Sequence, residues 1–234
     1  MILPFDELNL LEEKYNMPFL LGIDRETVEN DIYDLLIASF IYGVQGVNEM
    51  LGVNLETDAL RGEKIIHRKV AGKTWRDRLN AYFDDAFADE YGEYYVFISG
   101  QSVPLSDAVV RIAETETTRV FNETIIEFAE TAEDEDKTPK PPVPPIPGLP
   151  EIPNLPDEPE IDGQNRQGGR KAVKQWNSQE DDKVRFTHSV LDRTVVPLRD
   201  YFYTIYGDRA MAPGMFGNPA EDCNCRCFIT VRWA

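Results

Sequence analysis

Residues 174–202 read KQWNSQEDDKVRFTHSVLDRTVVPLRDYF, and residues 213–227 read PGMFGNPAEDCNCRC. This stretch holds His188, one of two histidines, and all three cysteines of the chain. Short β-branched runs accompany it at Thr194–Val196 and Phe228–Val231. Such runs, broken by glycine and proline, predict a small β-containing module and not an amphipathic helix. We define residues 171–234 as the C-terminal module.

The order K-x-W, D-x-x-V-R-x-x-H, L-D, P-A-E and N-C-R-C resembles the Mu F-like phage head morphogenesis family of minor capsid proteins. Two upstream blocks also resemble this family, Gly72–Arg78 (GKTWRDR) and Arg111–Asn122 (RIAETETTRVFN). The chain departs from the family pattern at Glu114, where a basic residue is usual, and at Arg193, where glycine is usual. The motif residues carried over are Trp176, Asp182, Arg185, His188, Asn224, Cys225, Arg226 and Cys227.

The resemblance implies a minor capsid protein of a tailed bacteriophage and not an enzyme. It implies association with the portal protein, with the major capsid and scaffolding proteins as further candidate partners, and a part in procapsid assembly or in genome packaging and delivery. The protein is then expected in the virion head, in the procapsid interior or at the portal vertex, after synthesis in the bacterial cytoplasm. No cofactor is expected.

Composition supports a protein partner over a nucleic acid or a membrane. The formal charge of the 234 residues is −18, with a pI near 4.5, so DNA contact is not supported. The one basic cluster, Arg166–Lys174, is short. The N-terminus lacks the pattern of a signal peptide, and the apolar run Leu35–Val44 is too short to span a membrane. Three cysteines do not make a disulfide framework and fit a reducing compartment.

Apolar spacing predicts an α+β fold with a mainly helical body. An irregular arm (1–23) precedes a helix from the N-cap Asp24 to Leu51, in which Gly43 and Gly46 mark a close helix approach or a bend. The further elements expected are a loop containing Gly52 and Gly62, a helix from Thr74 to about Glu90, a strand at Tyr94–Ser99, a helix from the cap Ser106 to about Ala132, and a last strand, Cys227–Trp233.

Ten of the sixteen prolines lie between Glu133 and Asp162. Proline removes a hydrogen-bond donor and fixes φ, so this acidic segment is expected to be extended or disordered. We therefore divide the chain into a helical body (1–132), a proline-rich insert or linker (133–170) and the C-terminal module. The insert is expected to act as a spacer or as a ligand for another capsid component.

Glu116 is the first candidate site residue. Ile112 and Val120 lie four residues to either side, on the same helical face. A carboxylate on such a face needs a partner, and the module offers Arg185, His188 and Arg226. We predict a structural clamp in which one of the arginines pins the module to the helix. His188 itself is expected to bond Asp181, Asp182 or Asp192.

An effector enzyme is the alternative function. Glu114-Thr115-Glu116 matches the E-x-E of ADP-ribosyltransferases in letters, but residues two apart on a helix point about 200° from each other. Cys225 and His188 could form a nucleophilic pair, and a metal-dependent hydrolase would need more ligands, because His67 is distant in sequence. A host-encoded interaction protein on the same fold is a third hypothesis.

Cys223, Cys225 and Cys227 alternate, and in a strand alternate residues share a face. Three thiols could then converge with His188 in a Cys₃His zinc site. The spacing is unusual for zinc, so we expect buried thiols that pack, with Asn224 and Arg226 making polar contacts on the other face.

Overall fold

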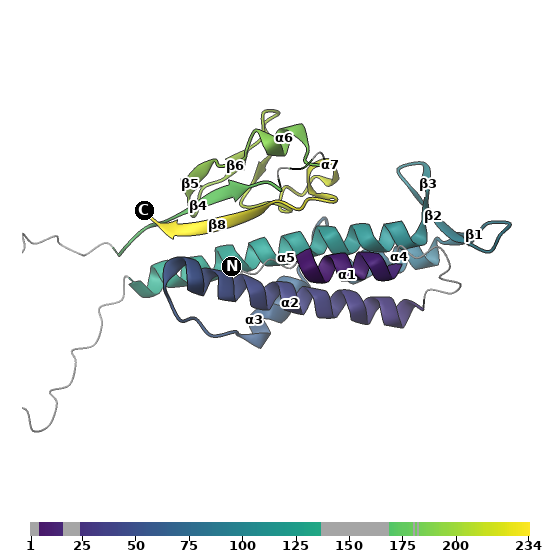
Figure 1. Cartoon of the computed structure of the whole chain (residues 1–234), viewed down its shortest axis with the longest axis horizontal. Coiled ribbons are helices and arrows are strands. Elements are labelled where there is room, and N and C mark those ends of the chain that lie inside the picture. Colours follow the sequence, from purple (N-terminus) through teal and green to yellow (C-terminus); the bar gives the residue numbers. More distant parts are fainter. Residues whose placement is uncertain (1–4, 16–23, 137–168, 180, 182) are drawn as a thin grey trace, which may run out of the picture.

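The computed structural model describes residues 5–15, 24–136, 169–179, 181 and 183–234. A helical body carries a small β-containing module on one side (Figure 1), which confirms the predicted α+β class. The helices are α1 (Phe5–Tyr15), α2 (Arg25–Leu51), α3 (Ala59–Ile66), α4 (Trp75–Asp84), α5 (Leu105–Asp136), α6 (Phe186–Ser189) and α7 (Pro219–Asp222). The strands are β1 (Phe87–Ala88), β2 (Tyr94–Ile98), β3 (Gln101–Pro104), β4 (Ala172–Asn177), β5 (Val195–Pro197), β6 (Phe202–Tyr203), β7 (Arg209–Ala210) and β8 (Phe228–Trp233).

Two long helices form the body. α2 begins where the sequence predicts, because the Asp24 carboxylate accepts a hydrogen bond from the backbone N–H of Thr27 at 2.9 Å. α5 begins one residue before the predicted cap Ser106 and continues beyond Ala132 to Asp136. The two helices run in the same direction, and α3 and α4 lie on the path between them (Figure 1).

The two helices approach each other closely at Gly43. A Cβ atom there would lie 2.8 Å from both Cβ and Cγ2 of Thr124 and 3.1 Å from the carbonyl oxygen of Phe121. Any side chain would therefore push α2 away from α5. The prediction of a close approach is confirmed at this glycine.

Two helices of the helical body, α1 and α3, were missed in the sequence. Residues 5–15 were expected in an irregular arm but form α1, which buries Leu8, Leu11 and Tyr15. These residues have helical spacing, and Pro4 and Pro18 both lie outside the helix. α3 occupies part of the expected loop, and Gly62 lies within it because a Cβ there would meet the Phe40 ring at 2.9 Å.

α4 is shorter than predicted. It ends at Asp84 rather than near Glu90, and Phe87 and Ala88 pair with Tyr95 and Tyr94 of β2. Gly92, just after the expected end of the helix, has φ +83° and lies between β1 and β2. β2 matches the predicted strand, and β3, which was not predicted, completes a three-stranded antiparallel sheet. This sheet projects beyond the end of the helical body (Figure 1).

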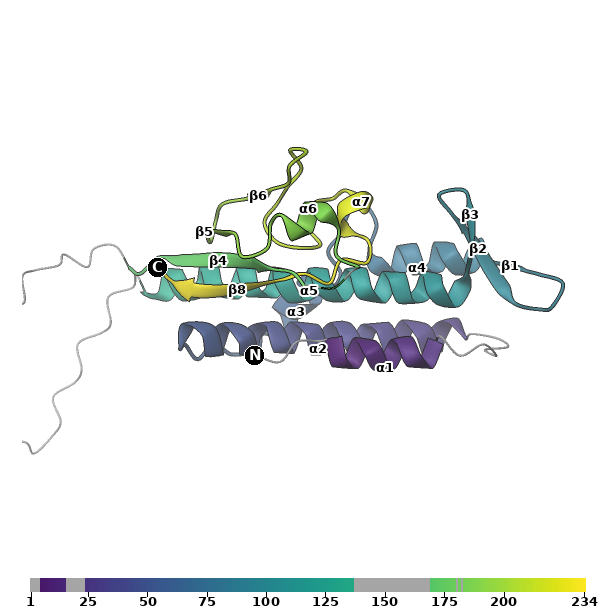
Figure 2. The ribbon, with the colours of Figure 1, turned by 45° about the horizontal axis from the view of Figure 1, so that its top comes forward.

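The module contains a second antiparallel sheet in the order β5-β4-β8. Lys174 is paired with Val231 and Trp176 with Ile229. Ile229 and Val231 are buried and Trp233 is partly buried, so the predicted alternation along the last strand is confirmed. α5 lies between this module on one side and α1 and α2 on the other (Figure 2).

Replacing Gly43 by alanine tests this packing. In an exposed helix the change stabilises by about 1 kcal/mol. Here we expect a loss of about 1–3 kcal/mol, because the added Cβ overpacks against Thr124. Urea unfolding of Gly43→Ala measures this, and Gln45→Ala on the exposed side of α2 is the control. A Gly43→Ala protein as stable as the parent would show that the helices are further apart than described.

Candidate functional site

The central part of α5 is buried on all sides. Every residue from Glu116 to Ile126 is buried, a run longer than three helical turns. The body covers one side of this segment and the module covers the other (Figure 2). Polar members of this run therefore need partners from neighbouring elements.

A network of buried ion pairs lies on the side of α5 that faces the helical body. One carboxylate oxygen of Glu116 accepts from Arg78 of α4, and the other accepts from Arg119 Nε at 2.8 Å. Arg119 Nη1 also bonds Glu123 Oε2 at 2.7 Å and the carbonyl oxygen of Ile65 at 2.9 Å. Arg68 Nε lies 2.5 Å from the second oxygen of Glu123. The network joins α4, the end of α3 and α5.

Burial and the neighbouring charges have opposite effects on the pKa values of Glu123 and Arg119. Desolvation raises the pKa of Glu123, although Arg119 and Arg68 oppose this effect. Desolvation also opposes the charge of Arg119, but Glu116 and Glu123 outweigh it and raise the pKa of the guanidinium. Burial therefore disfavours the charged form of both residues, and their neighbours of opposite charge counteract it.

The predicted partners of Glu116 are wrong. Arg185 donates to the carbonyl oxygen of Cys223, Arg226 pairs with Asp181, and His188 faces two cysteines. Arg78 reaches Glu116 instead, because α4 lies against the same face of α5. The signal was present in the sequence, since Arg78 ends the block Gly72–Arg78 and Glu116 lies in the block Arg111–Asn122.

Neutral hydrogen bonds join the module to the central part of α5, and ion pairs of Arg199 with Glu133 and Asp134 join it to the C-terminal end. Thr118 Oγ1 donates to the carbonyl oxygen of Cys225. The Asn122 amide donates to the carbonyl oxygen of Cys227 at 3.1 Å and accepts from the backbone N–H of Ile229 at 2.9 Å. These α5 residues were not predicted as site residues, although both lie in the block Arg111–Asn122.

Within the module, His188, Cys225 and Cys227 form one buried cluster. The distances from His188 Nδ1 are 3.5 Å to Cys225 Sγ and 3.6 Å to Cys227 Sγ. The Trp176 ring meets the imidazole edge to face at 5.2 Å, and the Phe216 ring stacks on it at 5.6 Å. Among the described residues, this cluster has the donor atoms to hold a metal ion.

Two predictions about this cluster are corrected. Cys223 is exposed and lies outside it, because Asn224 has φ +54° and the chain turns there instead of continuing as a strand. The carboxylate nearest His188 is Glu221 of the P-A-E motif, with Oε2 3.1 Å from Nε2. Asp181 pairs with Arg226 and Asp192 accepts from the Ser178 N–H, while Asp182 lies outside the described residues.

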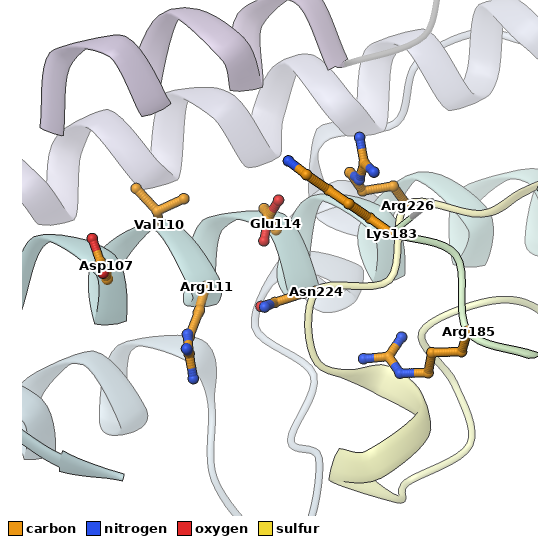
Figure 3. Close-up of a pocket in the computed structure, with 8 residues that line it drawn as sticks. All are labelled: Asp107, Val110, Arg111, Glu114, Lys183, Arg185, Asn224 and Arg226. Carbon is orange, nitrogen blue, oxygen red and sulfur yellow. The ribbon is translucent and has the colours of Figure 1, made fainter. Parts of the chain in front are cut away.

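A groove of about 470 Å³ lies between α5 and the module (Figure 3). The predicted clamp residues Arg185 and Arg226 line it, with Glu114 on the opposite wall. Glu116 is buried away from this groove and paired, so Glu114 and Glu116 do not form a joint acidic site. The remaining lining residues are Asp107, Val110, Arg111, Lys183 and Asn224.

Arg193 stands where the resembling family usually has glycine, and its backbone conformation explains why glycine suits this position. Its φ is +61°, a left-handed conformation that glycine adopts at little cost. Its backbone N–H donates to the carbonyl oxygen of Trp176 at 2.8 Å. The turn after L-D thus keeps the shape for which glycine is suited, although this chain has arginine.

Comparisons with known proteins agree with a phage head role. A segment of 56 residues is 37% identical to the "Minor head protein GP7" of Bacillus phage SPP1. The match covers 24% of this chain and 18% of that protein. No protein-family model matches the chain, and no solved structure does. Within the described ranges, none of the helices has the length and apolar character to cross a membrane.

Glu116→Gln tests the ion network. The amide keeps the shape but leaves Arg78 without its carboxylate partner and Arg119 with Glu123 alone, so we expect a loss of about 3–5 kcal/mol. Denaturant unfolding measures the loss. Glu135→Gln makes the same change at an exposed position of α5 and is expected to stay within about 0.5 kcal/mol. Equal stability of both variants would contradict a buried network.

Lys174 supplies a pH-dependent test of the module. It is fully buried, its Nζ donates to the carbonyl oxygen of Met211 at 2.7 Å, and desolvation lowers its pKa from 10.5 to about 8. The unfolded chain therefore binds this proton more tightly, so burial of the charged lysine opposes folding in full below pH 8. This cost is relieved as pH rises from 8 to 10.5, and the protein becomes more stable.

Lys174→Met removes the titration. The unfolding free energy of the variant minus that of the parent is expected to fall by about 3 kcal/mol between pH 8 and 10.5, at about 1.4 kcal/mol per pKa unit. Urea unfolding at the two pH values measures this difference, and Lys171→Met at an exposed position is the control. A constant difference for Lys174→Met would show that the ammonium group is solvated.

Proposed function

We propose that the protein is a minor capsid protein of a tailed bacteriophage that associates with the portal and acts in procapsid assembly or in genome packaging and delivery. The observation that carries this proposal is the 37% identity to the SPP1 minor head protein. The order of the motifs from Gly72 to Val231 supports the same role.

The charge of the chain favours a protein partner. At −18, the protein is repelled by the DNA that fills a phage head. Association with the portal needs a surface that can bury apolar area. The sheet of β1, β2 and β3 offers such a surface and projects from the body (Figure 1).

We define the aromatic sheet as Phe87, Tyr95 and Phe97, which share one face because Phe87 pairs with Tyr95 and Phe97 lies two residues further along β2. Phe87 and Phe97 are 37% and 63% exposed, and Tyr95 stacks on Phe87 at 6.2 Å. The rings of Phe87 and Phe97 stack at 5.1 Å and form one apolar surface. Exposed acidic residues lie close to it in the sequence, namely Asp84, Asp85, Glu90 and Glu93. The matching portal surface is expected to be an apolar hollow bordered by basic residues.

The enzyme alternative receives less support. Glu116 is neutralised by two arginines, and Glu114 faces the groove. Cys225 and His188 are both buried, so a substrate would not reach them without a rearrangement. These placements favour structural roles for the residues that could have been catalytic.

Particle composition tests the proposed role. Mass spectrometry of purified heads from the producing phage is expected to detect the protein at low copy, together with the portal protein. The double variant Phe87→Ser/Phe97→Ser is expected to reduce incorporation at least about 10-fold, because both rings lie at the centre of the contact. Tyr206→Ser changes an aromatic residue that is 76% exposed elsewhere and is the control.

Different results would contradict the role in the phage head and the assignment of the portal contact. Absence of the unmodified protein from purified heads would contradict the head role. Normal incorporation of the double variant would leave that role intact and contradict the assignment of the aromatic sheet as the portal contact.

A further inference from the structure

Three potential ligand atoms meet inside the module, and their spacing is that of a metal site. His188 Nδ1, Cys225 Sγ and Cys227 Sγ lie within 4.8 Å of one another, and all three residues are buried. Tetrahedral zinc has Zn–S near 2.3 Å and Zn–N near 2.0–2.1 Å, which places nitrogen and sulfur about 3.5–3.6 Å apart. The two observed nitrogen–sulfur distances are 3.5 and 3.6 Å.

A hydrogen bond from a thiol to His188 Nδ1 explains only one of the two nitrogen–sulfur distances. Neutral Nδ1 has one lone pair and accepts one hydrogen bond along it. Both sulfur atoms nevertheless lie at nearly equal distances from the same nitrogen. A shared centre bound by all three atoms accounts for both distances.

The histidine is oriented for binding through Nδ1. Its other nitrogen, Nε2, lies 3.1 Å from a carboxylate oxygen of Glu221. The geometry is not that of a hydrogen bond, but a carboxylate beside the second ring nitrogen is common in metal sites, where it favours binding through the first. The rings of Trp176 and Phe216 hold the imidazole plane from two directions.

The fourth position faces a small cavity. A space of about 10 Å³ adjoins the three ligands and is also lined by Gln179 and Arg226. That volume is close to what one water molecule requires. Cys223 does not take this position, because it is exposed beyond the turn at Asn224.

We propose that His188, Cys225 and Cys227 bind one Zn²⁺ ion, with a water molecule as the fourth ligand. Imidazole and thiolate ligands favour zinc, whereas hard cations such as Mg²⁺ and Ca²⁺ favour oxygen ligands. This set differs from the Cys₃His set considered from the sequence, because the three cysteines do not share a strand face.

The ion would brace the contact between the module and α5. The carbonyl oxygens of the two ligand cysteines accept the hydrogen bonds from Thr118 and Asn122. Fixing both sulfur atoms to His188 therefore also fixes the two carbonyls that α5 binds. Zinc would be structural, and its loss is expected to loosen the module first.

Metal analysis of the full chain tests the proposal. Protein purified without added chelator is expected to contain about one equivalent of zinc. His188→Asn, Cys225→Ser and Cys227→Ser are expected to lose it, while Cys223→Ser, the matched control, is expected to keep it. Zinc loss in Cys223→Ser equal to that in Cys225→Ser would contradict the assigned ligand set.

A second measurement does not depend on the folding of variants. The full-length protein is exposed to a strong chelator, dialysed and then titrated with Co²⁺, whose visible absorption reports tetrahedral thiolate coordination. The expected result is saturation at one equivalent, with a melting temperature that falls on chelation and returns with Zn²⁺. Less than about 0.1 equivalent of bound zinc, with no cobalt spectrum, would overturn the proposal and show that the cluster only packs.

Discussion

The burial of α5 on all sides is the constraint on which the rest of the structure depends. A helix covered all round must pair each polar side chain with another element, because water is not available to do so. Glu116, Arg119 and Glu123 point toward the body, while Thr118 and Asn122 point toward the module. The positions of α3, α4 and β8 follow from the partners that these side chains require.

In the central part of α5, from Glu116 to Ile126, the charged side chains lie on the body side. A buried ion pair is costly to desolvate and needs a fixed geometry, which packed helices supply. The module side of this central part uses neutral groups, whereas near the C-terminal end of α5 Arg199 of the module pairs with Glu133 and Asp134. Asn122 bonds both the carbonyl oxygen of Cys227 and the backbone N–H of Ile229, as a neighbouring strand would do. Because β8 ends the sheet order β5-β4-β8, this one side chain satisfies part of an otherwise open strand edge.

The sequence predicts what depends on local pattern and misses what depends on packing. The capping Asp24 and the apolar spacing after it define α2, and the alternation from Ile229 to Trp233 defines β8. Gly62 was misread as a loop signal, because its role is to admit the ring of Phe40. The burial of Glu116 was expected from its neighbours, but its partner Arg78 was missed, because the two residues lie in separate motif blocks that only the packing of α4 on α5 brings together.

Contacts that no local pattern predicts also join the two ends of the proline-rich segment. Residues 137–168 lie outside the described structure, so the expected insert is untested there, but the residues on either side are joined. Asp136 accepts from the backbone N–H of Arg170 at 2.7 Å, and Glu133 accepts from that of Ala172 at 2.6 Å. The entropic cost of bringing the two ends of a loop together rises only slowly with the length of the loop. The pairing of α5 with β4 therefore rests on these flanking contacts, and the fold can accept an intervening segment of almost any length.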